Sequence, residues 1–561
     1  MAEPQILKSV RAQGGSNLRC KGWKQEAILR LLENNMENAE NPEQLIIYGG
    51  IGKCARNWES YYAIVESLLK LEDDETLVVQ SGMPVAIFRT HGMAPNVVMA
   101  NTNIMKATWP IFYDLQDKNL TMFAQYTAGS WEYIGTQGVI QGTFETLASI
   151  GRLHFNDSLV GRILLTAGMG GMGGNQPRAM TMLGGVSICV DINEEVIERR
   201  LKVGYCDIVF KTFDEAVTAA KKAAIENRPL GIALVGNAAE VLQQAWDKSF
   251  VPDILTDMTP AHDPMMYIPA GFSANAAAEL RRTDRDKYLA VARETMVRHL
   301  RLMNMFYEKG VKVFEYGNSM RKEARDAGMN DAEAMKIPGF VAAYIRPLFC
   351  EGRGPFRWMC LSRDPEDLRI LDDLVLEMFS DDDLVTRWIK LARKHVPIEG
   401  LPARVCYLGY GQRAAFGVRV NQLVANRTLK APVCFSRDNL DSGSIVNPTF
   451  ESESMKDGSD LISDWPYLNA LLNASAGADL VAIHANYSMG EAVHTGVTQV
   501  ADGTEISRKR LEGSLNVDSG IGVIRHAQAG YERARKTAEK HKISVPLWWT
   551  SKATFGPKNA H

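Results

Sequence analysis

The sequence predicts an α/β protein in which a doubly wound, Rossmann-like domain is inserted into a discontinuous α/β core domain. Between about residues 140 and 345, strands alternate with helical stretches, which is typical of a parallel sheet covered by helices. The two flanking regions resemble each other, because both carry isolated strands that end in loops rich in Gly, Ser or Asn. We therefore expect a core domain formed by residues 1–140 and 346–561, and an inserted domain at 141–345.

The elements of the inserted domain can be assigned in order. Apolar runs bounded by turn residues predict strands, and longer stretches with helical periodicity predict helices. The expected strands are 162–168, 185–192, 230–237, 252–258 and 311–317. The expected helices are 214–227 and 238–247, with a longer helical segment between the last two strands.

The flanking regions supply isolated strands whose carboxyl ends are expected to present functional groups. They are the segments TLVVQSG, NVVMANTN, ARVCYLGYG, APVCFSR and ADLVAIHAN.

The composition excludes several classes of partner. The chain has 63 Lys and Arg against 66 Asp and Glu, so its formal net charge is -3. A protein that binds nucleic acid or an anionic membrane surface is expected to show a basic excess, and this chain has none. At 46% apolar residues, the chain can bury large cores.

The cysteines and the amino terminus indicate a cytoplasmic protein. Eight scattered cysteines without a C-x-x-C pair argue against a zinc site or a disulfide framework, and favour a reducing compartment. The first residues lack the apolar core of a signal peptide. The histidines show no paired ligand spacing, so no metal is expected.

The strongest local motif is Gly168-x-Gly170-x-x-Gly173, which follows a predicted strand and precedes a predicted helix. In dinucleotide-binding folds such glycines permit a tight turn, close approach to a pyrophosphate and tight helix packing. Asp191 ends the next strand, where an acid usually binds a ribose hydroxyl of NAD. The context favours an NAD site over an ordinary glycine-rich turn.

Other strand ends are weaker candidates when each is judged alone. The cluster Tyr48-Gly49-Gly50 follows the strand QLIIY and is compatible with either a tight turn or a ligand contact. Asn237-Ala238 and the segment 257–263 lie at strand ends of the inserted domain, where such a sheet binds its nucleotide.

Candidate catalytic residues also have ordinary structural alternatives. Arg404 could lower the thiol pKa of Cys406, although a buried cysteine is most often inert. The loop 436–444 carries two acids beside an arginine, and could transfer protons or serve as a solvated cap. Arg357 could clamp a carboxylate or form a structural ion pair, and His484 could be a site residue or a polar loop residue.

Seven long motifs, taken together, resemble the urocanase (urocanate hydratase) family, and they extend over nearly the whole chain. They are YGGIGKCARNWESY, TAGSWEYIGTQGVIQGT, TAGMGGMGGNQPRAM, GLPARVCYLGYGQR, RDNLDSGS, DGSDLISDWPYLNALLN and GVIRHAQAGYERA. The resemblance implies a homodimer with a tightly bound NAD+ in each inserted domain. In this family NAD+ serves as an electrophile toward the imidazole ring of urocanate, without net hydride transfer, and water adds to the ring.

The resemblance also implies roles for individual residues. Cys406 is expected close to the nicotinamide, Arg357 at the substrate carboxylate and Asp438 as the proton carrier, while Tyr48 and His484 complete the catalytic set. The expected NAD contacts are Gly49, Gly50, Gln125, Gly171, Met172, Gly173, Asp191, Asn237, Ala238, Thr259, His262, Tyr267, Ile268 and Tyr316.

The chain departs from the family pattern near the expected substrate. The usual HHGGGVGMG segment is replaced by the shorter 484–490, where Asn486 and Tyr487 add bulk in place of glycines. Four other positions also differ from the family pattern. Val196 replaces the usual Arg and Met83 the usual Lys, while MTPAH stands for the usual QTSAH and GYGQR for GLGDR. These departures predict a ring-modified urocanate, bearing sulfur or a methyl group, as the substrate, with plain urocanate as the other possibility.

Two further classes of function share some of these motifs. An NAD-dependent oxidoreductase acting on a small carboxylate would have the same glycine motif, but would release reduced nicotinamide. A catalytically silent NAD-binding regulator would be expected to lose Cys406, Arg357 and the Asp438 loop, all of which are present here.

Overall fold

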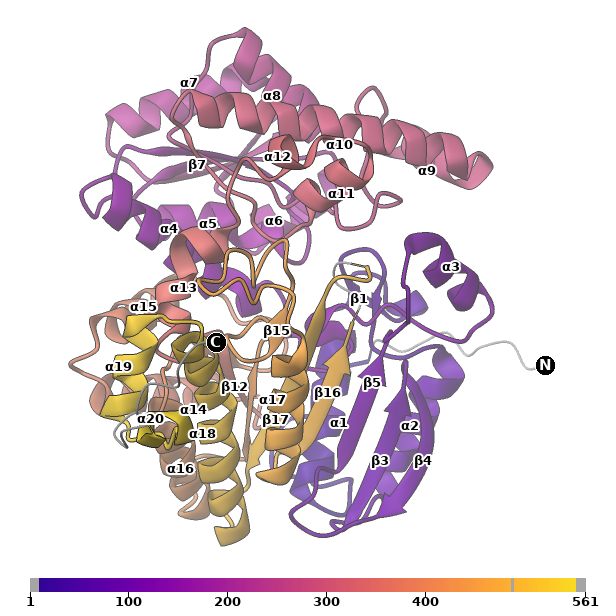
Figure 1. The fold of residues 1–561 in the computed structure, drawn as a ribbon, viewed down its shortest axis with the longest axis vertical. Helices are drawn as coiled ribbons and strands as arrows, with labels where there is room; N and C mark the ends of the chain where they lie inside the picture. Colours follow the sequence, from indigo (N-terminus) through magenta and orange to yellow (C-terminus); the bar gives the residue numbers. More distant parts are fainter. Residues whose placement is uncertain (1–9, 486–488, 551–561) are drawn as a thin grey trace, which may run out of the picture.

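The computed structural model describes residues 10–485 and 489–550, which form two sheets with their helices (Figure 1). One sheet has six parallel strands, and the other is a mixed sheet to which both the amino-terminal and the carboxyl-terminal parts contribute. The predicted α/β fold, with a Rossmann-like unit between the two halves of a second unit, is confirmed.

The parallel sheet has the strand order β11-β10-β6-β7-β9-β8. The side chains of β6 are all buried, as expected for an apolar strand covered on both faces. The chain adds strands on one side of β6 and then returns to add β10 and β11 on the other, so a topological switch point lies between β6 and β10. The strands are β6 Ile163–Ala167, β7 Val186–Asp191, β8 Ile208–Phe210, β9 Leu230–Val235, β10 Ile254–Leu255 and β11 Lys312–Val313.

The mixed sheet has the order β13-β12-β14-β17-β16-β5-β3-β4, with β15 paired to β17. Its two halves join where β16 runs parallel to β5, with Leu480 opposite Val97 and His484 opposite Asn101. Its strands are β3 Glu75–Gln80, β4 Met83–Arg89, β5 Val97–Asn101, β12 Phe356–Cys360, β13 Ala403–Cys406, β14 Val433–Arg437, β15 Ile445–Val446, β16 Leu480–His484 and β17 Val493–Ala501. A two-stranded ladder joins β1 Ile46–Tyr48 to β2 Gly52–Lys53.

Helices cover the mixed sheet unevenly. In Figure 1, α17 and α18 lie in front of it and α1 and α2 behind it, while no described helix covers the near face of β5, β3 and β4. The helices of the two flanking parts are α1 Trp23–Glu37, α2 Trp58–Lys70, α3 Trp109–Asp117, α13 Arg346–Phe349, α14 Pro365–Met378, α15 Asp383–His395, α16 Gln412–Ala425, α17 Asp464–Ser475, α18 Glu505–Gln528, α19 Glu532–Lys540 and α20 Pro546–Thr550.

The helices around the parallel sheet match most of the expected ones. The long helical segment is divided into two helices, because the side chain of Asp284 accepts the amide of Lys287 and begins a new helix there. The helices are α4 Gln137–His154, α5 Gln176–Met182, α6 Glu194–Lys202, α7 Phe213–Ile225, α8 Ala238–Asp247, α9 Ala274–Thr283, α10 Arg285–Glu308, α11 Met320–Asp326 and α12 Asp331–Ala334.

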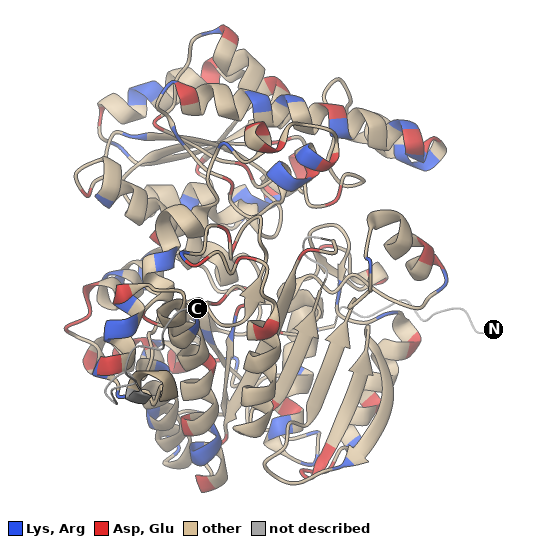
Figure 2. Cartoon of the chain, viewed as in Figure 1, with Lys and Arg blue, Asp and Glu red and all other residues tan. Residues whose placement is uncertain are grey.

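Charged residues of both signs are spread over the helices, in line with the near-neutral balance (Figure 2). Among the described residues, no helix combines the length and apolar character needed to cross a bilayer. The proposed boundaries near residues 140 and 346 stay a prediction.

Candidate active site

A cavity of about 600 Å³ lies between the two sheets. From the Rossmann-like side it is lined by the loop after β6 and by the ends of β7 and β9. From the other side it is lined by Tyr48, Gln125 and the loop after β14. All fourteen residues predicted to contact NAD line this cavity, together with Tyr48 and Asp438. The structure therefore brings most of the predicted site residues to one place.

The glycine loop after β6 needs glycine for steric reasons. Gly168 has φ +84°, and a Cβ there would lie 2.2 Å from the carbonyl oxygen of Met258. A Cβ on Gly173 would lie 2.2 Å from the carbonyl oxygen of Gly168. Gly170 differs, since the nearest atom to its Cβ would be 3.8 Å away, and it lines the cavity. The loop thus packs tightly against the segment that follows β10, while its tip lies open to a ligand.

The two glycine segments share one anionic acceptor, the carboxylate of Glu40. Its Oε1 accepts the Gly171 amide at 3.1 Å, and its Oε2 accepts the Gly50 amide at 3.3 Å. Glu40 also lines the cavity. Amides from both sides of the cavity therefore already face a negative charge, as expected of backbone that binds phosphates.

The acid at the end of β7 supports the glycine loop. Asp191 accepts the Met169 amide at 2.7 Å and the Asn193 amide at 2.9 Å. Burial raises the pKa of its carboxyl above the ordinary range, although these two bonds oppose the shift. Asn237 caps α8 and donates to the Ile268 carbonyl at 2.9 Å. These side chains hold the strand ends in place around the cavity.

On the opposite wall of the cavity, Tyr48 is hydrogen-bonded to Gln125. The Tyr48 hydroxyl donates to the Gln125 carbonyl at 2.6 Å, and burial raises the pKa of that hydroxyl. Gln125 has φ +40°, which is a strained conformation for a side chain with a Cβ. Its buried Oε1 has no hydrogen-bond partner among the described residues. This orphaned acceptor suits an amide-bearing ligand such as nicotinamide.

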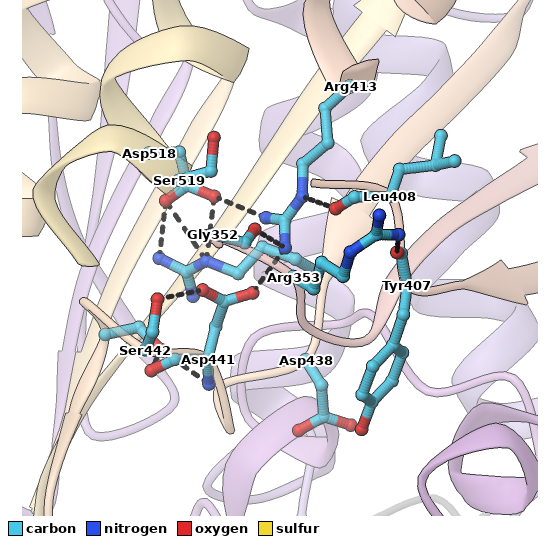
Figure 3. Close-up of polar contacts among 12 residues, drawn as sticks. Gly352, Arg353, Tyr407, Leu408, Arg413, Asp438, Asp441, Ser442, Asp518 and Ser519 are labelled. Atoms are coloured by element: carbon cyan, nitrogen blue, oxygen red, sulfur yellow. Dashed lines mark hydrogen bonds and ion pairs between the residues drawn. The ribbon is translucent and has the colours of Figure 1, made fainter. Parts of the chain in front are cut away.

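The two acids of the loop after β14, Asp438 and Asp441, have different surroundings (Figure 3). Of the two, only Asp438 lines the cavity. Asp438 pairs with Arg357 at 2.6 Å and accepts the Leu440 amide at 3.1 Å. Asp441 is fully buried and pairs with Arg413 at 2.7 Å, and Arg413 also lies 3.5 Å from Asp518. The Asp441 network is structural, whereas Asp438 is a fixed carboxylate at the site.

Arg357 lies behind Asp438 rather than on the cavity wall. It is buried on β12, and its guanidinium donates to the Asp438 carboxylate and to the Glu132 carbonyl at 2.9 Å. A substrate carboxylate would have to share or displace Asp438 to reach it. In this structure Arg357 orients Asp438, and its expected contact with a substrate stays a prediction.

Cys406 is also behind the wall. It ends β13 as a fully buried residue, and the next residue, Tyr407, lines the cavity instead. Arg404 is paired with Asp372 at 2.7 Å. Burial raises the pKa of the Cys406 thiol well above its ordinary value, with only partial opposition from the charge of Arg353. The surroundings therefore favour a neutral thiol.

His484 does not line the cavity. The Asn101 side-chain amide lies 3.1 Å from its Nδ1, and its ring centroid is 5.2 Å from that of His494. Burial lowers the pKa of His484 to about 3, so the ring is neutral at physiological pH. The substituted residues Asn486 and Tyr487 lie outside the described residues.

Several cavity residues carry no sequence signal of function. They come from segments without a strand-end motif, or precede one by several residues, so spacing could not single them out. They are Glu40, Tyr126, Phe340, Phe450 and Glu451. Tyr407 and Leu440 also line the cavity, and they lie in segments that the sequence did indicate, although neither residue was predicted individually.

Comparison with known families fits this geometry. The chain matches the urocanase N-terminal domain over residues 10–132, the urocanase Rossmann-like domain over 135–344 and the urocanase C-terminal domain over 347–540. The Rossmann-like domain implies a bound NAD, and the glycine loop, the bridged amides and the orphaned Gln125 acceptor suit one. Members of this family are urocanate hydratases, which are hydro-lyases. The chain belongs to the urocanase family and is a hydratase that uses NAD.

Proposed function

We propose that this protein adds water to an imidazole acrylate, and that its preferred substrate is a urocanate modified on the ring with sulfur or a methyl group. The observation that carries the proposal is the single cavity in which the glycine loop and Asp438 meet. The NAD+ held by the glycine loop would supply an electrophile toward the imidazole ring. The protein groups would bind the substrate, exclude water and move protons.

Asp438 is the proposed base for the attacking water. Its carboxylate is held by Arg357 and by the Leu440 amide, so it is oriented before substrate binds. Tyr48 and Gln125 form the facing wall and would position the nicotinamide amide. The fourteen predicted NAD contacts are proposed to act together in this cavity.

Two features support a ring-modified substrate. The 484–490 segment is shorter and bulkier than the family pattern, as described above. The cavity wall also contains Phe340, Leu440 and Phe450, and the two phenylalanine ring centroids lie 4.9 Å apart. A cavity wall of apolar and aromatic side chains suits a sulfur or methyl substituent on the ring. A hydrophobic pocket alone discriminates one methyl group by only about 10- to 200-fold.

The test is a turnover assay of urocanate beside its thio and methyl analogues, following loss of the conjugated acrylate absorbance. We expect kcat/KM for a modified analogue to exceed that for urocanate by at least about tenfold. Faster turnover of plain urocanate than of every analogue would contradict the substrate proposal. Reduced nicotinamide accumulating in proportion to substrate would instead indicate an oxidoreductase.

We further propose a homodimer whose interface includes α17 and the turn before it. Six large apolar side chains are exposed within twelve residues of this segment, and a contiguous apolar surface of this kind marks an interaction site. They are Leu461, Ile462, Tyr467, Leu468, Leu471 and Leu472, exposed by between 37% and 77%.

A further inference from the structure

A second carboxyl group lines the cavity that holds Asp438. Glu451 lies in the loop after β15 and is only 4% exposed, yet it forms part of the cavity wall beside Phe450 and Leu440. Its Oε1 accepts the Tyr126 hydroxyl at 3.1 Å. Its Oε2 is buried and has no hydrogen-bond partner among the described residues. One oxygen is thus anchored, and the other is available to a bound molecule.

Among the described residues, no arginine or lysine forms an ion pair with the Glu451 carboxyl. Arg346 lies nearby, but its guanidinium donates to the backbone carbonyl of Glu451 at 3.3 Å and not to the carboxyl. Arg321 is engaged by Glu315 and Glu453, both at 2.8 Å. Among the described residues that line the cavity, the only cationic side chain is Arg199, on α6 of the Rossmann-like unit.

These surroundings favour the neutral acid. Burial raises the pKa of Glu451 well above its ordinary value. Hydrogen bonds from its own backbone amide and from the side chains of Tyr126 and Asn447 only partly oppose the shift. The charge of Glu315 raises it further, and the His494 ring that packs on Tyr126 at 4.5 Å is itself kept neutral by burial. The raised pKa favours the protonated form of Glu451, and among the described residues its Oε2 meets no hydrogen-bonding atom.

Asp438 has a different environment, because its carboxylate pairs with Arg357 at 2.6 Å and accepts the Leu440 amide. Two carboxyls in one cavity, one paired with an arginine and the other buried without an ion-pair partner among the described residues, are the arrangement expected of a base and an acid. We propose that Glu451 is the proton donor that protonates the substrate side chain, complementary to Asp438 as the base. This inference rests on the proposed function, since it assigns a step within the same hydration.

The proton balance of the step is complete. Asp438 takes a proton from water as the hydroxyl oxygen bonds to the ring carbon. The O–H bond of Glu451 breaks as a C–H bond forms at the acrylate carbon. One proton then returns from Asp438 to Glu451, which restores both groups, and the net change is the addition of one water. No oxidant or reductant is needed.

The first test is Glu451→Gln, which keeps the size and the contact with Tyr126 but cannot transfer a proton. We expect kcat to fall by about 10²- to 10⁴-fold, while the NAD content of the purified protein stays unchanged. Glu145→Gln is the matched control. Glu145 is also a fully buried carboxyl whose pKa burial raises, but it lies outside the cavity, and its variant should keep near-wild-type kcat.

The second test is infrared difference spectroscopy at neutral pH. Wild-type protein should show the carbonyl stretch of a protonated acid that disappears in Glu451→Gln and shifts when an imidazole-acrylate analogue binds. A Glu451→Gln variant with at least half of wild-type kcat would overturn the inference. The inference would also be overturned if the wild-type protein lacked this band, or if the analogue did not shift it. This readout does not depend on whether the wild type shows hydratase turnover. Wild-type protein that hydrates no imidazole acrylate would instead overturn the proposed function.

Discussion

At the scale of single residues, the chemistry of an acid depends on its partner. Asp438 and Asp441 are three residues apart, yet Asp438 faces the cavity and Asp441 is fully enclosed by Arg413 and its neighbours. A sequence motif that contains both cannot tell them apart, because the difference comes from side chains on β12 and α16. The loop 436–444, which the sequence presents as one candidate unit, therefore contains one site residue, Asp438, and one residue of a structural network, Asp441.

This contrast predicts that Asp438→Asn retains NAD but loses turnover by about 10²- to 10⁴-fold, since the amide cannot accept a proton from water. The measurements are kcat and the NAD released on denaturation. Asp441→Asn is the matched control, because it weakens the Arg413 network away from the cavity. It should lower the free energy of unfolding while leaving kcat within about threefold, as expected when no proton-transfer group is removed. Near-wild-type kcat in Asp438→Asn would remove this residue from the mechanism.

At the scale of elements, different glycines of the loop after β6 serve protein stability and ligand binding. Gly173 has no room for a Cβ because of the Gly168 carbonyl, whereas Gly170 has room that opens into the cavity. We expect Gly173→Ala to lower the free energy of unfolding by about 1–3 kcal/mol, the usual cost of overpacking. Gly170→Ala should unfold like the wild type in denaturant but bind NAD more weakly. Equal stability of the two variants would contradict this account of the loop.

The same scale shows which elements the sequence could predict. Strands with a continuous apolar run, such as β6 and β9, were expected where they occur. The expected strands left out several that the structure shows, among them β4 and β12. They also left out β8, a short edge strand whose side chains are exposed or only partly buried. The run VHTGVTQVA of β17 was missed as well, because it mixes polar and apolar residues although eight of its nine positions are buried. The segment β17 forms a strand because it pairs with β14, β15 and β16. The sequence of one segment does not show which strands it will pair with. The strand-end residues of the cavity were predictable, and Glu40 and Glu451 were not, because only the tertiary fold brings them there.

At the scale of the whole molecule, the cavity depends on both sheets, so ligand binding should stabilise the protein as one unit. The apolar surface of α17 raises the separate question of assembly. Within that helix Asp464 is the only charged residue, and the helix lies at the front of the mixed sheet (Figure 1). A two-fold symmetric contact would cover this surface with the same surface of a second copy.

The corresponding prediction concerns oligomeric state. Wild-type protein should sediment as a dimer, and the double variant Leu461→Asp, Leu471→Asp should dissociate with a Kd weakened by roughly 100-fold or more, because each exposed leucine would be an interface anchor. Ile225→Asp is the matched control, since Ile225 is 83% exposed but lies at the end of α7 in the Rossmann-like unit. It should leave the dimer intact. A monomeric wild type, or a double variant that dimerises like the control, would show that α17 is not the interface.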